Sequence, residues 1–182
     1  MNIEEQDIRI VDGASIDSLD LVAIEKYIQL VKEDRPNPAN LNNERLYKLL
    51  NITRNGIPTL AAVMVFSLHP QILLPKYTIN TVSEEATFEA EGNIKQMLGD
   101  TLAFLSDKIT QYPLIVVREV ILNALMHRDF SIQSDEIPIQ VTLIKDRLEV
   151  VNPVYLRQRF IGGPTTWNFT SALHPRTTEP SC

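Results

Sequence analysis

The sequence predicts an α+β fold, because helical and strand-like apolar patterns occupy different stretches of the chain. The clearest stretch is Tyr112–Ser131, in which apolar residues recur at helical spacing after a proline. Directly after it, residues 137–151 alternate between apolar and polar positions around the turn Lys145-Asp146-Arg147, as in a β-hairpin. Two more segments, 17–32 and 93–109, also show helical spacing.

The composition limits the class of protein. With 182 residues, 44% hydrophobic and 22% charged, the chain resembles a soluble globular protein. A net charge of −6 argues against binding nucleic acid over the whole surface. The single cysteine, Cys182, excludes a disulfide framework and a thiolate metal site. The N-terminus does not resemble a signal peptide, and the most apolar segment, Leu60–Leu68, is too short to span a bilayer. We therefore expect a cytoplasmic protein.

The first third of the chain contains signals for two helices. Residues 8–11 alternate like a short strand, and Ser15 or Asp17 can cap the helix that follows. A Pro/Asn cluster at 35–38 predicts a loop. Asn42 or Asn43 can cap a second helix over residues 44–50, whose three leucines we expect to be buried: Leu46, Leu49 and Leu50.

The middle of the chain is less clear. Asn55-Gly56 predicts a tight turn, and residues 59–66 fit either a helix or a buried strand. A helix, a turn and an apolar stretch also suit a winged-helix DNA reader, but the cluster of polar and basic residues that base reading needs is absent. Residues 72–74 and 76–82 indicate strands, and the acidic stretch 84–91 indicates a loop. Residues 154–182 predict an irregular tail.

The helix at 113–126 has two different sides. The apolar side is formed by Leu114, Val117, Ile121, Ala124 and Leu125. On the opposite side lie Glu119, Asn123, Met126 and His127, so that a carboxylate and a carboxamide are neighbours one turn apart. The helix alone fits either a merely solvated face or a binding site.

The segments REVILNALMHRDF (118–130) and LEVVNP (148–153) resemble a divergent subgroup of GHKL-type ATPases. The GHKL fold is shared by histidine kinases, gyrase and Hsp90-type chaperones. The subgroup occurs in bacterial transcriptional regulators with an N-terminal Schlafen-type AlbA domain, often labelled helicase-related. Its signature has the form REAxxNAxxHRDY, then a hairpin, then NPGG. The resemblance extends upstream through residues 46–75 and covers roughly residues 15–153.

The resemblance implies a site for ATP and Mg²⁺ on the helix. Asn123 would coordinate Mg²⁺, and Glu119 would orient or deprotonate the attacking water as the catalytic base. The remaining signature residues would contribute to cofactor binding: His127, Arg128, Asp129 and Asn152. Arg128 would either contact phosphate or pair with Asp129 at the end of the helix, and the structural role is favoured.

The sequence also departs from the subgroup. Val154-Tyr155 replaces the two glycines expected after Asn152-Pro153. We therefore expect a fragment or degenerate relative that lacks the AlbA module, binds ATP weakly or not at all and is incomplete for ATP hydrolysis. The expected division is a remnant strand or linker at 1–14, a connecting α+β region at 15–110, the beginning of a GHKL-type α/β sandwich at 111–153 and the tail at 154–182.

Two kinds of partner follow from this reading. DNA would be bound in the full-length family through the N-terminal module, which would make the protein part of a transcriptional regulator. The alternative is a non-enzymatic dimerisation or protein-interaction module. Its contact surface would use the helices at 17–32 and 93–109, because a truncated GHKL unit exposes apolar surface.

Overall fold

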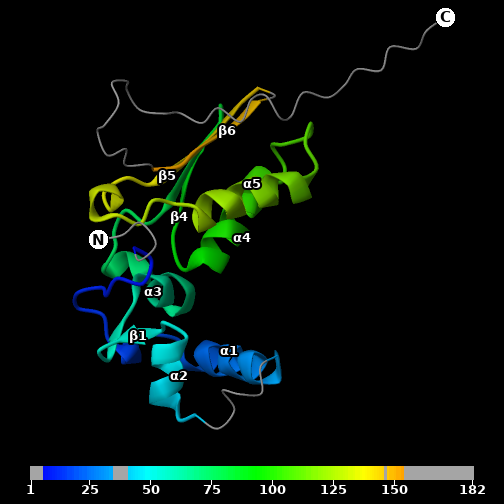
Figure 1. The fold of residues 1–182 in the computed structure, drawn as a ribbon. Coiled ribbons are helices and arrows are strands. Elements are labelled where there is room, and N and C mark those ends of the chain that lie inside the picture. Colours follow the sequence, from blue (N-terminus) through cyan, green and yellow to red (C-terminus); the bar gives the residue numbers. More distant parts are fainter. Residues whose placement is uncertain (1–5, 35–40, 146, 154–182) are drawn as a thin grey trace, which may run out of the picture.

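The computed structural model describes residues 6–34, 41–145 and 147–153, and its fold is α+β, as predicted (Figure 1). The helices are α1 (Leu21–Asp34), α2 (Asn43–Leu49), α3 (Leu60–Phe66), α4 (Ile94–Leu105) and α5 (Leu114–Met126). The strands are β1 (Thr53–Arg54), β2 (Ile57–Pro58), β3 (Ile79–Val82), β4 (Thr87–Ala90), β5 (Ile139–Ile144) and β6 (Arg147–Val151). None of the helices in these ranges has the length and apolar character needed to cross a membrane.

The main sheet has four strands in the order β4-β3-β5-β6. β3 and β5 are parallel, and the two outer pairs are antiparallel hairpins. A parallel pair needs a long crossover connection, which α4 and α5 provide. Both helices cover the same face of the sheet (Figure 1). The sheet turns buried side chains toward them, including Ile79, Val141, Leu143 and Val150.

This sheet crosses the boundary predicted at residue 110. β3 lies before the boundary and β5 after it, yet they pair over four residue positions. α4 packs against both α5 and β4. Residues 79–110 therefore belong to the same two-layer unit as the segment 111–153, rather than to a separate connecting region.

Two strand predictions in this unit are wrong. The acidic stretch 84–91 is not a loop throughout, because β4 lies within it and pairs with β3. β4 is stabilised by Phe88, whose ring stacks on that of Phe104 with 5.2 Å between centroids. Residues 72–74 do not form a strand, since a 3-10 helix occupies Pro70–Ile72. Both errors concern segments of three or four residues, which are too short for their apolar period to be read.

The N-terminal part is formed by α1, α2, α3 and the hairpin β1–β2. The predicted turn is confirmed: Asn55 and Gly56 both have positive φ, 52° and 78°, as the tight hairpin turn requires. Asn42 caps α2 by accepting a hydrogen bond from Arg45 N at 3.0 Å. The ambiguous segment 59–66 is a helix, because Thr59 caps it and burial is spread around it.

Other predictions in this part are corrected. Asp20, rather than Ser15 or Asp17, caps α1, and its carboxylate accepts hydrogen bonds from two backbone N–H groups. Ser15 caps a short 3-10 helix instead. In place of a strand at 8–11, the described residues form one isolated bridge between Ile10 and Thr59. The loop predicted at 35–38 and the tail at 154–182 lie outside the described residues.

The leucines of α2 are only partly buried. Leu46 is fully buried, Leu50 is half-buried and Leu49 is 59% exposed. The helix has only two turns, and it packs on the rest of the protein through the side that carries Leu46. The prediction that all three leucines are buried is therefore wrong for Leu49.

A polar cluster connects the N-terminal part to the sheet unit. Arg9 Nη2 donates to both carboxylate oxygens of Asp135, at 2.6 and 2.8 Å. The Tyr77 hydroxyl donates to the same carboxylate at 2.6 Å, and Arg9 Nε donates to the backbone oxygen of Phe130 at 3.3 Å. This cluster fixes the loop between α5 and β5, where the signature residues are found.

Candidate functional site on helix α5

Helix α5 begins directly after Pro113, which lacks an N–H group and favours a helix start. Its buried side is formed by Val117, Ile121, Ala124 and Leu125, as the apolar spacing predicts. Leu114 is the exception: it lies in the first turn and is 46% exposed. The opposite side carries Glu119, Asn123, Met126 and His127, all of them exposed.

Glu119 and Asn123 are neighbours on this exposed side, four residues and about one turn apart. Neither side chain forms a hydrogen bond or ion pair with another described residue. Their oxygen atoms are therefore free to bind a hard cation such as Mg²⁺, which prefers one or two protein oxygen ligands and keeps several waters. His127 ends the helix one turn further on, where its backbone N–H donates to the Asn123 carbonyl at 2.9 Å.

Arg128 lies away from this face. Its side chain is buried, and Nη2 donates to the carbonyls of Ser134 and Ile137 at 3.0 and 2.6 Å. The guanidinium carbon stands 4.2 Å from the centre of the Tyr77 ring, a cation–π contact. Burial lowers the pKa of Arg128, while the charges of nearby groups raise it. In this position Arg128 organises the loop after α5.

Asp129 and Asn152 bring the two parts of the signature together. The Asp129 N–H donates to the Pro153 carbonyl at 3.3 Å, which joins the end of α5 to the end of β6. The Asp129 carboxylate accepts from Ser131 N at 2.8 Å and so shapes the loop. Asn152 Oδ1 is buried and accepts no hydrogen bond from the described residues. The segments HRDF and VVNP, more than twenty positions apart in the sequence, are thus adjacent in the fold.

The predicted site residues therefore form two groups. Glu119, Asn123 and His127 share the exposed side of α5, and Asp129 and Asn152 lie at the junction between α5 and β6. Arg128 belongs to neither group. Among the described residues, no three His, Cys, Asp or Glu side chains converge as a metal cluster would require. A cation on α5 would therefore take few protein ligands.

Sequence reasoning missed the cluster of Arg9, Tyr77 and Asp135. These residues are 58 to 126 positions apart, so no local pattern connects them. Burial, followed by the hydrogen bond to Asp135, raises the pKa of Tyr77 to about 12. The only local signal is that Asp135 lies near the signature, in a loop with few apolar residues.

Three comparisons with known proteins were informative to different degrees. Residues 2–80 match the family model described as a domain of unknown function, DUF8451. No curated protein matches the sequence. The crystal structure of the DIP2311 protein from Corynebacterium diphtheriae is similar, with 18% sequence identity and a TM-score of 0.45. The similarity covers 85% of this chain and 34% of that one, so the chain spans about a third of the length of DIP2311.

Proposed function

We propose that this protein is a module of a transcriptional regulator and carries the Mg²⁺-binding half of a GHKL-type nucleotide site on α5. In this proposal, Asn123 is the cation ligand, and Glu119 occupies the position at which active GHKL-type ATPases carry the catalytic base. The observation that supports it most directly is the pairing of these two exposed side chains, one turn apart and without a partner among the described residues.

The position of the signature supports the same proposal. The hairpin β5–β6 follows α5, and the Asp129–Pro153 hydrogen bond places its end beside the end of the helix. A nucleotide that reaches from Asn123 to this junction would meet Asp129 and Asn152. Asn152 Oδ1 is a buried acceptor at this junction that no described residue satisfies.

The site is expected to bind nucleotide weakly and not to hydrolyse it. Bound Mg²⁺ would neutralise phosphate charge, and Asn123 would hold and orient it through the amide oxygen. The sequence continues from Asn152-Pro153 into Val154-Tyr155, where the related proteins have two glycines. Without these glycines, the adenine side of the site lacks the backbone freedom that close approach of a ligand needs.

The experiment is a calorimetric titration with ATP in the presence of Mg²⁺. We expect saturable binding that requires Mg²⁺ and that weakens at least about tenfold in Asn123→Ala, which corresponds to about 1.4 kcal/mol. The matched control is Asn43→Ala, which removes an exposed asparagine from α2 and should leave binding unchanged. Equal affinity of wild type and Asn123→Ala, or an absence of binding, would overturn the proposal.

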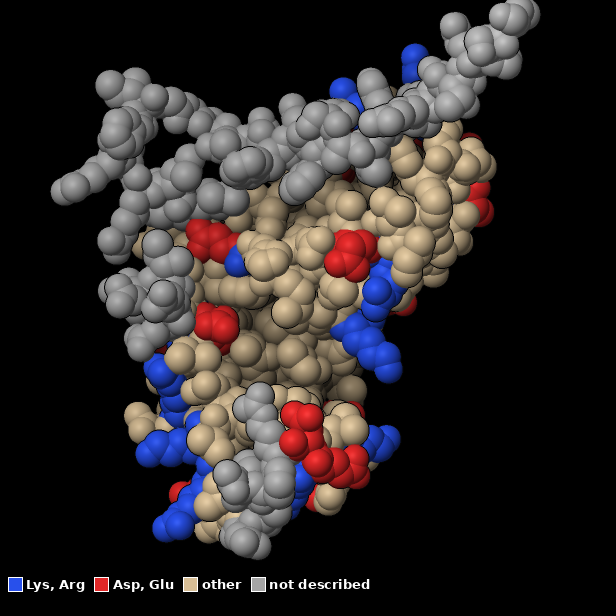
Figure 2. Space-filling model, turned by 45° about the vertical axis from the view of Figure 1, so that its right-hand side comes forward, with Lys and Arg blue, Asp and Glu red and all other residues tan. Residues whose placement is uncertain are grey.

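We assign DNA binding to another module of such regulators rather than to this chain. The net charge of −6 opposes contact with phosphates over a wide surface. Figure 2 shows one face on which basic and acidic side chains are mixed, with broad uncharged surface between them. The regulatory role then consists of sensing nucleotide, while DNA contact lies elsewhere.

A second function, homodimerisation, is favoured by helix α1. Only Ile24 and Ile28 of this helix are buried, although its apolar side carries further large apolar residues. Val22 and Leu30 are 65% and 63% exposed. The apolar side of an amphipathic helix normally packs against another element. The other helix expected in a dimer, α4, has no large apolar side chain exposed, which leaves α1 as the contact surface.

A further inference from the structure

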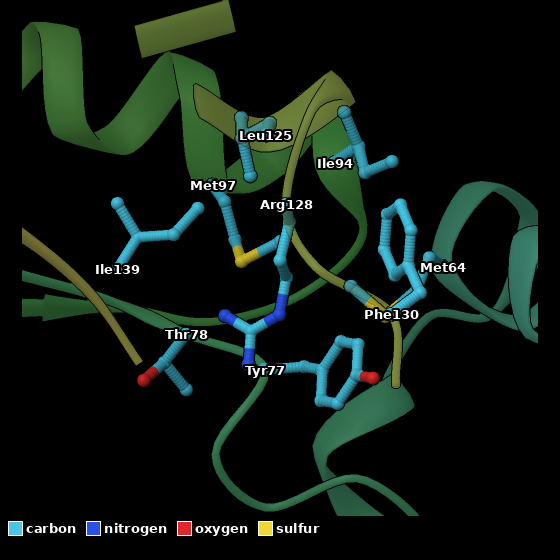
Figure 3. Close-up of a pocket in the computed structure, with 9 residues that line it drawn as sticks. All are labelled: Met64, Tyr77, Thr78, Ile94, Met97, Leu125, Arg128, Phe130 and Ile139. Atoms are coloured by element: carbon cyan, nitrogen blue, oxygen red, sulfur yellow. The ribbon is translucent and has the colours of Figure 1, made fainter. Parts of the chain in front are cut away.

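A small, partly open cavity lies beneath the end of α5 (Figure 3). The volume that the centre of a water-sized sphere can occupy is about 10 Å³, which is enough to hold one water molecule or one ion of similar size. The walls come from α3, α4, α5 and the sheet, and most of them are hydrocarbon or thioether, including Met64, Met97, Leu125 and Ile139. Figure 3 shows the Arg128 guanidinium reaching the middle of these side chains.

Two nitrogen atoms of the Arg128 guanidinium, Nε and Nη1, have no hydrogen-bond acceptor among the described residues. The side chain is only 5% exposed, and Nε and Nη1 are buried and have no hydrogen-bond partner among the described residues. Nη2 is the atom that binds the two loop carbonyls. Buried guanidinium donors are rarely left unpaired, because they lose their bonds to water and gain nothing in exchange.

Neighbouring side chains do not supply the acceptor. The Asp135 carboxylate is engaged by Arg9 and by the Tyr77 hydroxyl. The Thr78 hydroxyl donates to Glu89 at 2.9 Å and forms no hydrogen bond with Arg128 Nε or Nη1. The Tyr77 ring lies 4.2 Å from the guanidinium carbon, and its hydroxyl is bonded to Asp135 rather than to Arg128 Nε or Nη1. The acceptor must therefore be a particle inside the cavity.

The walls distinguish between the two particles that fit. A water molecule would accept from Arg128 but would have to direct its own two hydrogens at walls that are mostly apolar. A monatomic anion accepts hydrogen bonds only, and its charge is opposite to that of the guanidinium. We propose that this cavity, with Arg128 Nε and Nη1 as donors, is a binding site for a single chloride-sized anion.

The first test is a crystal structure of the wild-type protein grown in sodium bromide. We expect an anomalous bromide peak within hydrogen-bond distance of Arg128 Nε or Nη1. Density that fits water in both chloride and bromide crystals, with no anomalous signal, would overturn the proposal. The measurement does not depend on ATP and is therefore independent of the function proposed for α5.

The second test uses thermal unfolding at constant ionic strength. Replacing gluconate, which is too large for the cavity, by chloride should raise the midpoint of the wild-type protein in proportion to the logarithm of chloride concentration. Arg128→Met should lose this dependence, whereas Arg147→Met, at an exposed arginine on β6, should keep it. A wild-type midpoint that is the same in both salts contradicts the proposal. If Arg128→Met does not fold, the wild-type series and the bromide structure decide.

Discussion

Tyr77 contacts two charged side chains, Arg128 through its ring and Asp135 through its hydroxyl. Its ring lies under the Arg128 guanidinium, and its hydroxyl donates to Asp135, which also binds Arg9. Ionisation of the phenol would place a negative charge next to the carboxylate and remove the hydrogen that joins them. The neutral phenol is therefore the form that the folded protein stabilises.

This arrangement predicts a loss of stability in alkali. Because folding raises the pKa of Tyr77 from 10.0 to about 12, its contribution is complete below pH 10 and disappears as the pH rises to 12. The size of the effect is about 2 to 3 kcal/mol of unfolding free energy. Denaturant unfolding at pH 9 to 12 should show this decline in wild type and in Tyr27→Phe, but not in Tyr77→Phe. A decline of the same size in Tyr77→Phe would contradict the assignment.

Among the elements, the start of α4 is the most precisely defined. Asn93 caps the helix, and Gln96 returns a hydrogen bond to the Asn93 N–H at 2.9 Å. The preceding Gly92 has a φ of +95° and is held on both sides by the Gln71 amide. A β-carbon at residue 92 would overlap the Gln96 side chain. The position therefore requires glycine for its backbone angle and for space.

Alanine substitutions at Gly92 and Gly99 should have opposite effects on the free energy of unfolding. Gly92→Ala should lower the free energy of unfolding by about 1 to 3 kcal/mol, because it combines strain with loss of the cap. Gly99→Ala lies in the exposed middle of α4 with open space around it, and should raise the free energy by about 0.5 to 1 kcal/mol. Urea denaturation of both variants measures the difference. Stabilisation by Gly92→Ala would show that the turn is wrongly described.

The elements that the sequence predicts best are those whose causes are local. Asn42 and the Asn55-Gly56 turn act within a few residues, so their patterns can be read directly. The exposed pair Glu119 and Asn123 follows from helical periodicity in the same way. β4 is different, because it becomes a strand only by pairing with β3 and by stacking Phe88 on α4.

The position of the Arg128 side chain in the site also could not be predicted from local sequence. The sequence places it beside His127 and Asp129, and a helix end can direct such a side chain either outward or inward. Its direction depends on Tyr77 and on the carbonyls of Ser134 and Ile137, which come from another element and a following loop. Such a choice depends on tertiary contacts that neighbouring residues in the sequence do not encode.

At the scale of the whole molecule, the proposed homodimer depends on α1. It lies at the end of the molecule opposite the main sheet (Figure 1). If α1 pairs with a second copy, light scattering should give the mass of a dimer, and Leu30→Glu should give a monomer without lowering the thermal midpoint. The matched control is Ile132→Glu, at a residue that is 63% exposed like Leu30 but lies in the loop after α5. A monomeric wild type over the whole concentration range contradicts this dimer.

The contact between Arg9 and Asp135 has a consequence for the order in which the protein assembles. The two residues are 126 positions apart in the sequence. Strand β3 likewise pairs with β5, which lies 60 positions later. On the ribosome, Arg9 leaves the exit tunnel long before Asp135 is made. Arg9 can take its final place only after the loop that follows α5 has been synthesised. The segment around Arg9 is therefore fixed late although it is made before its partner, and it stays accessible to chaperones and proteases until then.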